Sequence, residues 1–156
     1  SYDTTLKADE IKKALQSFKP DYARVDFLSK PHYLVINDAK ATNIFASLSL
    51  LEQQTWLGKT LWYLGGQMKG QELNILEKFN EFQNIDFAIF GPQIHALKSI
   101  LKRSYWVEED FTNLLKKVNK DTLGASYQKI VFSPGGTLQP QFLNYRHSAQ
   151  AFLDAW

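Results

Sequence analysis

The chain has 156 residues, of which 44% are hydrophobic and 14% aromatic, and its formal net charge is +2 at pH 7. This length is typical of one domain with its own core, so we expect a single domain over residues 1–156. The small net charge argues against a nucleic-acid binder that acts by bulk charge. The lack of cysteine argues against disulfides, thiolate zinc sites and a cysteine nucleophile.

The compartment is left open by the sequence. No apolar run approaches the roughly 20 residues of a membrane helix, so we expect a soluble protein without a membrane span. The chain starts at Ser1, with no Met and no basic and apolar leader. A removed signal peptide and a shortened chain would give the same start. Both a cytoplasmic and an exported protein therefore fit, and the oligomeric state is equally open.

The first half of the chain predicts helices and an antiparallel strand pair. Residues 8–18 carry apolar side chains at helical spacing. Residues 23–28 alternate polar and apolar, and residues 33–36 form a continuous apolar run, so we expect two paired strands joined by a turn. Helical spacing returns over residues 44–51, whereas residues 56–64 are equally compatible with a helix and a strand.

The second half alternates between helical patterns and short apolar runs. The pattern predicts helices over residues 71–82, 92–103, 106–118 and 145–156, a strand over 127–132, and either a strand or a buried helical turn over 85–90. Helices thus predominate, with three to five short strands between them. This order predicts an α+β fold with a small, mostly antiparallel sheet that carries helices on one side. An all-α fold is the alternative.

No assembled catalytic motif is present. Gly58-Lys59-Thr60 resembles the end of a phosphate-binding loop, but Gln53 stands where that loop needs its first glycine. No serine lies in a G-x-S-x-G turn. The histidines, His32, His95 and His147, are not spaced as metal ligands. We therefore predict no catalytic residue, no metal and no cofactor, and we lean against an enzyme.

A basic and aromatic stretch is the surface feature that stands out. His95, Lys98 and Lys102 fall at i, i+3 and i+7 of a predicted helix, and Arg103 and Tyr105 follow directly. Basic side chains beside aromatic rings can bind phosphates and stack on bases, and they can also anchor an acidic protein. We predict that these five residues form a partner-binding surface.

The aromatic residues around the undecided segment 56–64 suggest a second kind of site. Trp56, Trp62 and Tyr63 lie in or beside it, and Trp106 follows the basic stretch. Trp and Tyr fill cores, but they also line ligand pockets. We name these four residues as candidate pocket aromatics.

Taken together, these observations predict a non-catalytic domain that binds a protein partner through its basic and aromatic surface. The alternative is an apolar small-molecule binder, or a minor enzyme with an aromatic pocket. Nucleic-acid binding is a weaker alternative.

Overall fold

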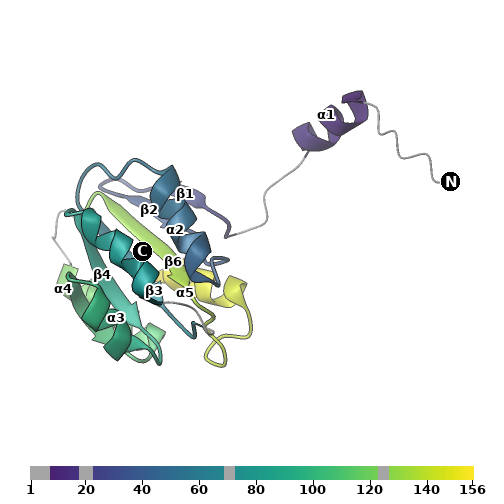
Figure 1. Cartoon of the computed structure of the whole chain (residues 1–156). Coiled ribbons are helices and arrows are strands. Elements are labelled where there is room, and N and C mark those ends of the chain that lie inside the picture. The colour runs from purple at the N-terminus through teal and green to yellow at the C-terminus, as the bar shows by residue number, and fades with distance from the viewer. Residues whose placement is uncertain (1–7, 18–22, 69–72, 123–126) are drawn as a thin grey trace.

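The computed structural model describes residues 8–17, 23–68, 73–122 and 127–156. Its centre is a six-stranded sheet with the strand order β1-β2-β6-β3-β4-β5 (Figure 1). The strands are β1 (Asp26–Ser29), β2 (Leu34–Asn37), β3 (Thr60–Gly65), β4 (Ile85–Phe90), β5 (Ser104–Glu108) and β6 (Lys129–Gly135). β1 pairs antiparallel with β2, whereas the pairings from β2 through β6, β3 and β4 to β5 are parallel.

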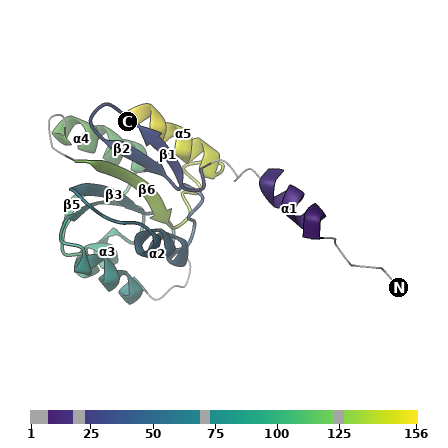
Figure 2. The same cartoon turned by 90° about the horizontal axis from the view of Figure 1, so that it is seen from above.

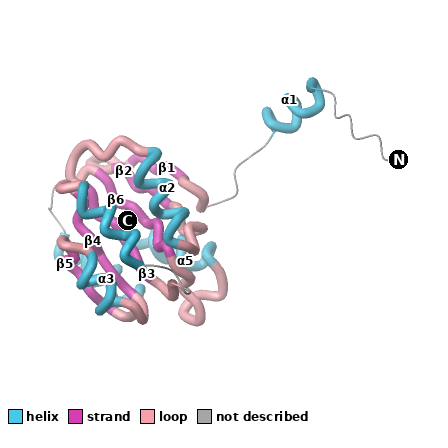
Figure 3. Tube along the Cα trace, in the orientation of Figure 1, coloured by secondary structure: helices cyan, strands magenta, loops and turns pink. Residues whose placement is uncertain are grey.

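Helices cover both faces of the sheet. The covering helices are α2 (Ile44–Gln53), the 3-10 helix η1 (Leu73–Glu81), α3 (Ile94–Ile100), α4 (Phe111–Thr122) and α5 (Tyr145–Ala155), and a further helix, α1 (Ala8–Ser17), precedes them in the chain. Figure 2 shows α2 and α3 on one side of the strands and α4 and α5 on the other. Figure 3 shows the strands as a layer between these helices. In Figures 1 and 2, α1 lies apart from the sheet.

Two cores result, one on each face. Trp62 and Leu64 of β3 join the core under α2, η1 and α3, whereas Leu61 and Tyr63 join the core under α4 and α5. Every residue of β3 and β4 is buried. Parallel strands covered on both faces have near-continuous apolar sequences because neither face meets water.

The predicted fold class is corrected in its sheet. An α/β fold with a mostly parallel sheet replaces the predicted α+β fold with a mostly antiparallel sheet and helices on one side, and the all-α alternative is wrong. The antiparallel pair of β1 and β2 was predicted correctly. The prediction of antiparallel pairing was wrong for the other strands of the sheet. These strands alternate with helices, and such βαβ order produces parallel pairing.

Three predicted elements have different boundaries or types. The helix predicted over 106–118 began too early, because Trp106 and Val107 belong to β5 and α4 starts at Phe111. The helix predicted to reach residue 103 ends at Ile100. The segment 73–81 is a 3-10 helix, although its apolar face does bury Leu76 and Phe79 as an amphipathic helix would. Of the undecided segment 56–64, residues 60–64 belong to strand β3.

Candidate functional site

The candidate site lies at the edge of the sheet where the five parallel strands end, which we call the carboxyl edge. A pocket of about 200 Å³ opens there between the segments that follow β2 and β6. After β2 the chain enters α2 on one face, and after β6 it enters α5 on the opposite face. Neighbouring parallel strands whose connections leave on opposite faces mark the usual ligand-binding position of an open α/β sheet.

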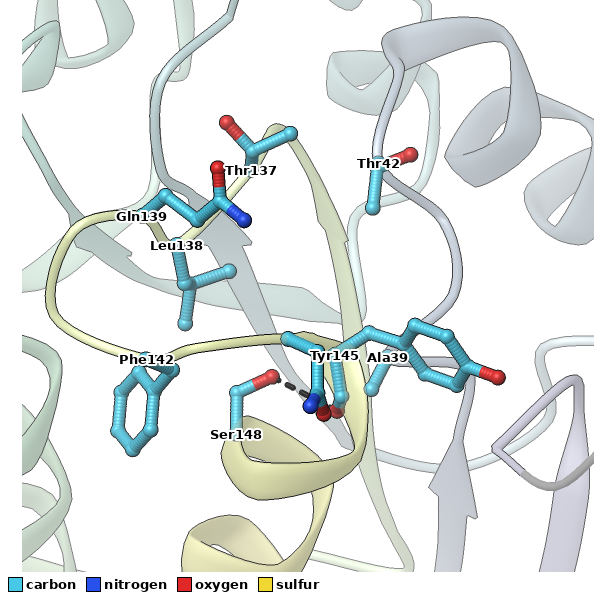
Figure 4. Close-up of a pocket in the computed structure, with 9 residues that line it drawn as sticks. Ala39, Thr42, Thr137, Leu138, Gln139, Phe142, Tyr145 and Ser148 are labelled. Carbon is cyan, nitrogen blue, oxygen red and sulfur yellow. Dashed lines mark hydrogen bonds between the residues drawn. The ribbon is translucent and has the colours of Figure 1, made fainter.

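The pocket is lined by neutral side chains from three segments. Figure 4 shows Thr42 across the space from Thr137 and Gln139, with Tyr145 and Ser148 at the start of α5. The full lining is Ala39, Thr42, Thr137, Leu138, Gln139, Phe142, Asn144, Tyr145 and Ser148. These residues offer hydroxyl and amide groups beside apolar ones. Such a site can orient a small polar ligand by hydrogen bonds.

The segment after β2 is held in place by backbone hydrogen bonds. The Gly135 N–H donates to the Ala41 carbonyl at 2.8 Å, and the Ala41 N–H donates to the Asp38 carbonyl at 2.9 Å. The Asn43 side chain then caps α2 by accepting from the Ala46 N–H at 3.0 Å. Thr42 is therefore presented at the pocket from a fixed turn.

The segment after β6 ends in a similar cap. The Asn144 Oδ1 accepts from the backbone N–H groups of Arg146 and His147, at 2.9 and 3.2 Å. The Thr137 backbone exchanges two hydrogen bonds with Gln67 after β3. Both sides of the pocket thus belong to rigid turns that are set by side-chain caps and strand pairing.

Glycines let three strand ends approach one another at this edge. A Cβ atom on Gly65 would lie 2.1 Å from the Phe90 carbonyl oxygen, and one on Gly136 would lie 2.8 Å from the Gly65 oxygen. Gly66, with φ +89°, would bring a Cβ to 2.7 Å from the Thr137 oxygen. Only glycine fits such distances, so the close packing of the ends of β3, β4 and β6 requires glycine at these three positions.

A buried acid lies beside the pocket. Asp38 follows β2, is 5% exposed, and its Oδ2 accepts from the Ser133 hydroxyl at 2.9 Å. The Ser47 hydroxyl of α2 and the Trp62 indole N–H both donate to the Ser133 carbonyl at 3.0 Å. Burial raises the pKa of Asp38 to about 6, although the Ser133 hydrogen bond opposes that rise. Asp38 therefore ties the pocket turn to β6.

Basic side chains stand around the pocket rather than inside it. The Lys40 ammonium lies 5.5 Å from the centre of the Tyr145 ring, and the Arg146 guanidinium lies 5.9 Å from the same ring. The neighbouring His147 is exposed. Among the described lining residues none is charged, so positive charge at the rim would favour a ligand with anionic groups.

The predicted partner-binding residues are divided between the exposed side of α3, one hollow that Lys102 lines, and a second that Arg103 and Tyr105 line together. His95 and Lys98 are exposed on α3, and Lys102 lines a hollow beside Glu77 and Glu81. Arg103 turns inward, where its guanidinium donates to the Ile85 carbonyl at 2.9 Å and to the Phe82 carbonyl.

Tyr105 is 62% exposed on β5. The partner-binding role of the five residues, His95, Lys98, Lys102, Arg103 and Tyr105, remains a prediction.

The candidate pocket aromatics are divided between the two faces of the sheet. Trp62 and Tyr63 are fully buried and point to opposite faces of β3. Trp56 packs on Trp62, with ring centres 5.0 Å apart. Trp106 lies partly buried on the other face, 6.4 Å from the ring of Tyr127. Their binding role also stays a prediction.

The pocket itself was missed in the sequence, although signals for it exist. Gly65-Gly66 and Gly135-Gly136 each follow an apolar run, and Asp38 follows the run that ends at Ile36. With the strands taken as parallel, these turns would all fall at one edge of the sheet. The predicted antiparallel sheet would instead place these turns at opposite edges.

Relatives by sequence are enzymes of one kind. No protein-family model matches the chain. The UDP-N-acetylmuramoylalanine--D-glutamate ligase of Dechloromonas aromatica is 29% identical over 127 residues, which cover 78% of this chain and 27% of the ligase. The ligase of the same name from Tropheryma whipplei (strain Twist) is 26% identical over 148 residues, or 93% of this chain and 30% of the ligase. The ligase of the same name from Buchnera aphidicola (strain Tuc7) is 24% identical over 165 residues, which cover 98% of this chain and 37% of the ligase.

Two solved structures share the fold of this chain. MurF from Acinetobacter baumannii superimposes with a TM-score of 0.66 at 17% identity, over 96% of this chain and 33% of that one. MurF ligase from Thermotoga maritima, in complex with ADP, superimposes with a TM-score of 0.55 at 16% identity, over 93% of this chain and 35% of that one. The chain thus spans about a third of the length of the proteins it matches.

These comparisons overturn the predicted function. A non-catalytic domain that works by protein binding was expected, yet the proteins that resemble this chain are ligases, which are enzymes. The prediction failed because it required a catalytic motif within this sequence, whereas the matched region is only part of each ligase. Every helix in the described part of the chain falls short of the length and apolar character that a membrane span requires.

Proposed function

We propose that this chain is one domain, over residues 1–156, of a ligase that joins D-glutamate to UDP-N-acetylmuramoylalanine, and that its pocket binds the amino acid. The observation that carries the proposal is the position of the pocket along the matched sequence. The Buchnera ligase matches 98% of the chain, so the match runs across both segments that line the pocket.

The size and polarity of the pocket support an amino-acid ligand. Its volume of about 200 Å³ is below the roughly 300–1,000 Å³ of pockets for drug-sized ligands. The hydroxyls of Thr42 and Thr137 and the amides of Gln139 and Asn144 can donate hydrogen bonds to carboxylates. D-Glutamate carries two carboxylates, which the basic rim would attract.

The chemical task of such a pocket is orientation. When an amino acid is joined through its nitrogen, the amine must be neutral and must face the acceptor carbonyl. Neutral hydrogen-bonding groups hold the carboxylates without fixing a positive charge on the amine. The uncharged lining suits that task, because a carboxylate beside the amine would favour its protonated form.

Amino-acid binding can be tested on this chain by titrating it with D-glutamate and recording backbone amide NMR shifts. We expect the largest shifts at Thr42, Thr137 and Asn144. Thr42→Val keeps the shape of the side chain but removes its hydroxyl, so the affinity should fall about three- to tenfold. Thr55→Val, at an exposed position outside the pocket, is the matched control and should bind as the unaltered chain does.

L-Glutamate in the same titration tests whether the pocket reads the configuration of the ligand. Shifts that cluster away from the pocket, or the absence of any shift at saturating D-glutamate, would refute the proposed function.

A further inference from the structure

One buried polar side chain has no role in the fold so far described. Asn37 is the last residue of β2 and is 0% exposed. Among the residues that the structure describes, neither its Nδ2 nor its Oδ1 has a hydrogen-bond partner within reach. Buried amides are nearly always hydrogen-bonded, because an unsatisfied one loses its contact with water and gains nothing in return. Asn37 therefore requires an explanation.

The alternation of β2 places Asn37 on the side of the sheet that carries the pocket. Val35 and Ala39 belong to the core under α4 and α5, whereas Ile36 belongs to the opposite core. The ladder to β6 continues past Asn37, since the Asp38 N–H donates to the Phe132 carbonyl at 2.8 Å. Asn37 thus shares a face with Ala39, which lines the pocket two residues further on.

The helix above Asn37 brings a pocket residue to its level. The Tyr33 hydroxyl donates to the Trp156 carbonyl at 2.9 Å, so the end of α5 lies beside the start of β2. From Tyr33 to Asn37 the strand advances about 13 Å, and from Trp156 back to Ser148 the helix advances about 12 Å. Because the two advances match, Ser148, which is 1% exposed and lines the pocket, is the α5 residue that we place nearest the level of Asn37.

The neighbours of Asn37 use their polar groups elsewhere. The Ser148 hydroxyl donates to the Tyr145 carbonyl at 2.9 Å, which leaves its oxygen as an acceptor. Asp26, opposite Asn37 on β1, accepts from the Ala23 N–H at 2.7 Å. Phe132, opposite it on β6, is apolar. The hydrogen-bonding capacity of Asn37 is therefore directed at something other than these neighbours.

We propose that Asn37 is a positioning residue for the ligand of the pocket, an inference that rests on the proposed function. Asn37 is not among the residues that line the pocket, so the proposal includes a bridging water between the ligand and its amide, which offers both a donor and an acceptor. An amino acid presents the complementary pair, a carboxylate and an amine. Such a water is stable where two to four polar groups surround it. The unsatisfied amide of Asn37 thus lowers the stability of the fold but raises the affinity for the ligand.

Asn37→Leu separates this role from a structural one. Leucine fills a similar volume without polar atoms, so the variant should unfold at the same or a higher urea concentration. Its affinity for D-glutamate should nevertheless fall about tenfold. The matched control is Asn80→Leu, since the Asn80 side chain bonds the Ile100 carbonyl and the Lys102 N–H far from the pocket. That variant should unfold earlier and bind D-glutamate unchanged.

The side-chain amide signal of Asn37 in the unaltered chain gives a second measurement that needs no variant to fold. Saturating D-glutamate should shift it. If D-glutamate shifts Thr42 and Asn144 but leaves the Asn37 side-chain signal unmoved, and Asn37→Leu binds with unchanged affinity, this inference is wrong and the proposed function stands. If D-glutamate shifts no pocket residue, the proposed function fails and this inference fails with it.

Discussion

Two aspartates, Asp38 and Asp86, are each 5% exposed and lie at opposite ends of the parallel strands. Asp86, at the edge where the strands begin, accepts from the Tyr127 hydroxyl at 2.7 Å and pairs with the Lys59 ammonium at 3.3 Å. Asp38, at the carboxyl edge, is held by the Ser133 hydroxyl, and burial raises its pKa to about 6. Lys59 compensates one buried acid by direct contact. The positive charge of Arg24 and the hydrogen bonds that Asp38 accepts only partly offset the cost of burying the other.

The rest of each edge follows the same division. Where the strands begin, which we call the amino edge, side chains bind backbone carbonyls. Arg103 holds the Ile85 carbonyl, and the Asn84 amide donates to the carbonyls of Trp56 and Gly58 at 2.6 Å. At the carboxyl edge Ser47 and Trp62 also donate to a strand carbonyl, but here the strand ends in addition approach one another backbone to backbone, through glycine. The amino edge is therefore built for stability, and the carboxyl edge leaves room for a ligand.

The same substitution at both edges should give the greatest difference in stability. Gly65→Ala would place a Cβ atom 2.1 Å from the Phe90 carbonyl oxygen, which belongs to a buried strand and cannot yield. We expect a loss of more than about 3 kcal/mol of unfolding free energy. Gly58→Ala would instead place a Cβ atom 2.9 Å from the Gln128 side-chain oxygen, which can shift at the expense of its hydrogen bond from the Lys59 N–H, and with its φ of +79° we expect a smaller loss of about 1–2 kcal/mol.

Urea unfolding followed by Trp fluorescence measures both variants against the unaltered chain. Equal losses for Gly65→Ala and Gly58→Ala would show that the backbone contact at the carboxyl edge yields as readily as a side chain. The division between the two edges would then be wrong.

Local pattern was enough to predict many elements but not their arrangement. Helical spacing over residues 44–51 correctly predicted α2, because its apolar side chains pack on one face of the sheet. The strand pair of β1 and β2 was predictable because a short turn joins it. The parallel sheet was not deduced, because β6 enters between β2 and β3 from far along the chain. No local period encodes that insertion.

The site depended on that missing information. Thr42 and Thr137 lie 95 residues apart and meet only when β2 and β6 pair. Arg103, which the sequence presented as a surface cation, is bound to carbonyls that the helix pattern did not place near it. A side chain that ends up satisfying backbone groups cannot be told from an exposed one by composition alone.

Asp38→Asn should change how stability depends on pH. Because the pKa of Asp38 in the folded protein, about 6, lies above the ordinary value of 3.8, its contribution is fully present below about pH 4. It is lost as the pH rises through about 6. This loss should be on the order of 3 kcal/mol. Asparagine is uncharged and keeps an acceptor for Ser133. The unfolding free energy of the variant should therefore not show this decrease as the pH rises.

Urea unfolding at intervals between pH 4.5 and 7.5 measures the effect as the difference between the two proteins. The variant should be the more stable of the two at pH 7.5. Parallel profiles would show that Asp38 is compensated after all, as Asp86 is by Lys59, and the contrast between the edges would lose its electrostatic part.

Tyr127→Phe should reveal the smaller, side-chain contribution at the amino edge. The Tyr127 ring is 6% exposed and its hydroxyl donates to the Asp86 carboxylate, so removal leaves a buried carboxylate oxygen with Lys59 as its remaining partner. We expect a loss of about 1–2 kcal/mol. Tyr105→Phe removes an exposed hydroxyl nearby and should stay within about 0.5 kcal/mol. D-Glutamate should bind both variants with unchanged affinity, since neither residue lines the carboxyl-edge pocket. A loss of binding in Tyr127→Phe alone would mean that the amino edge supports the pocket through the strands, and that stability and ligand binding are not divided between the two edges.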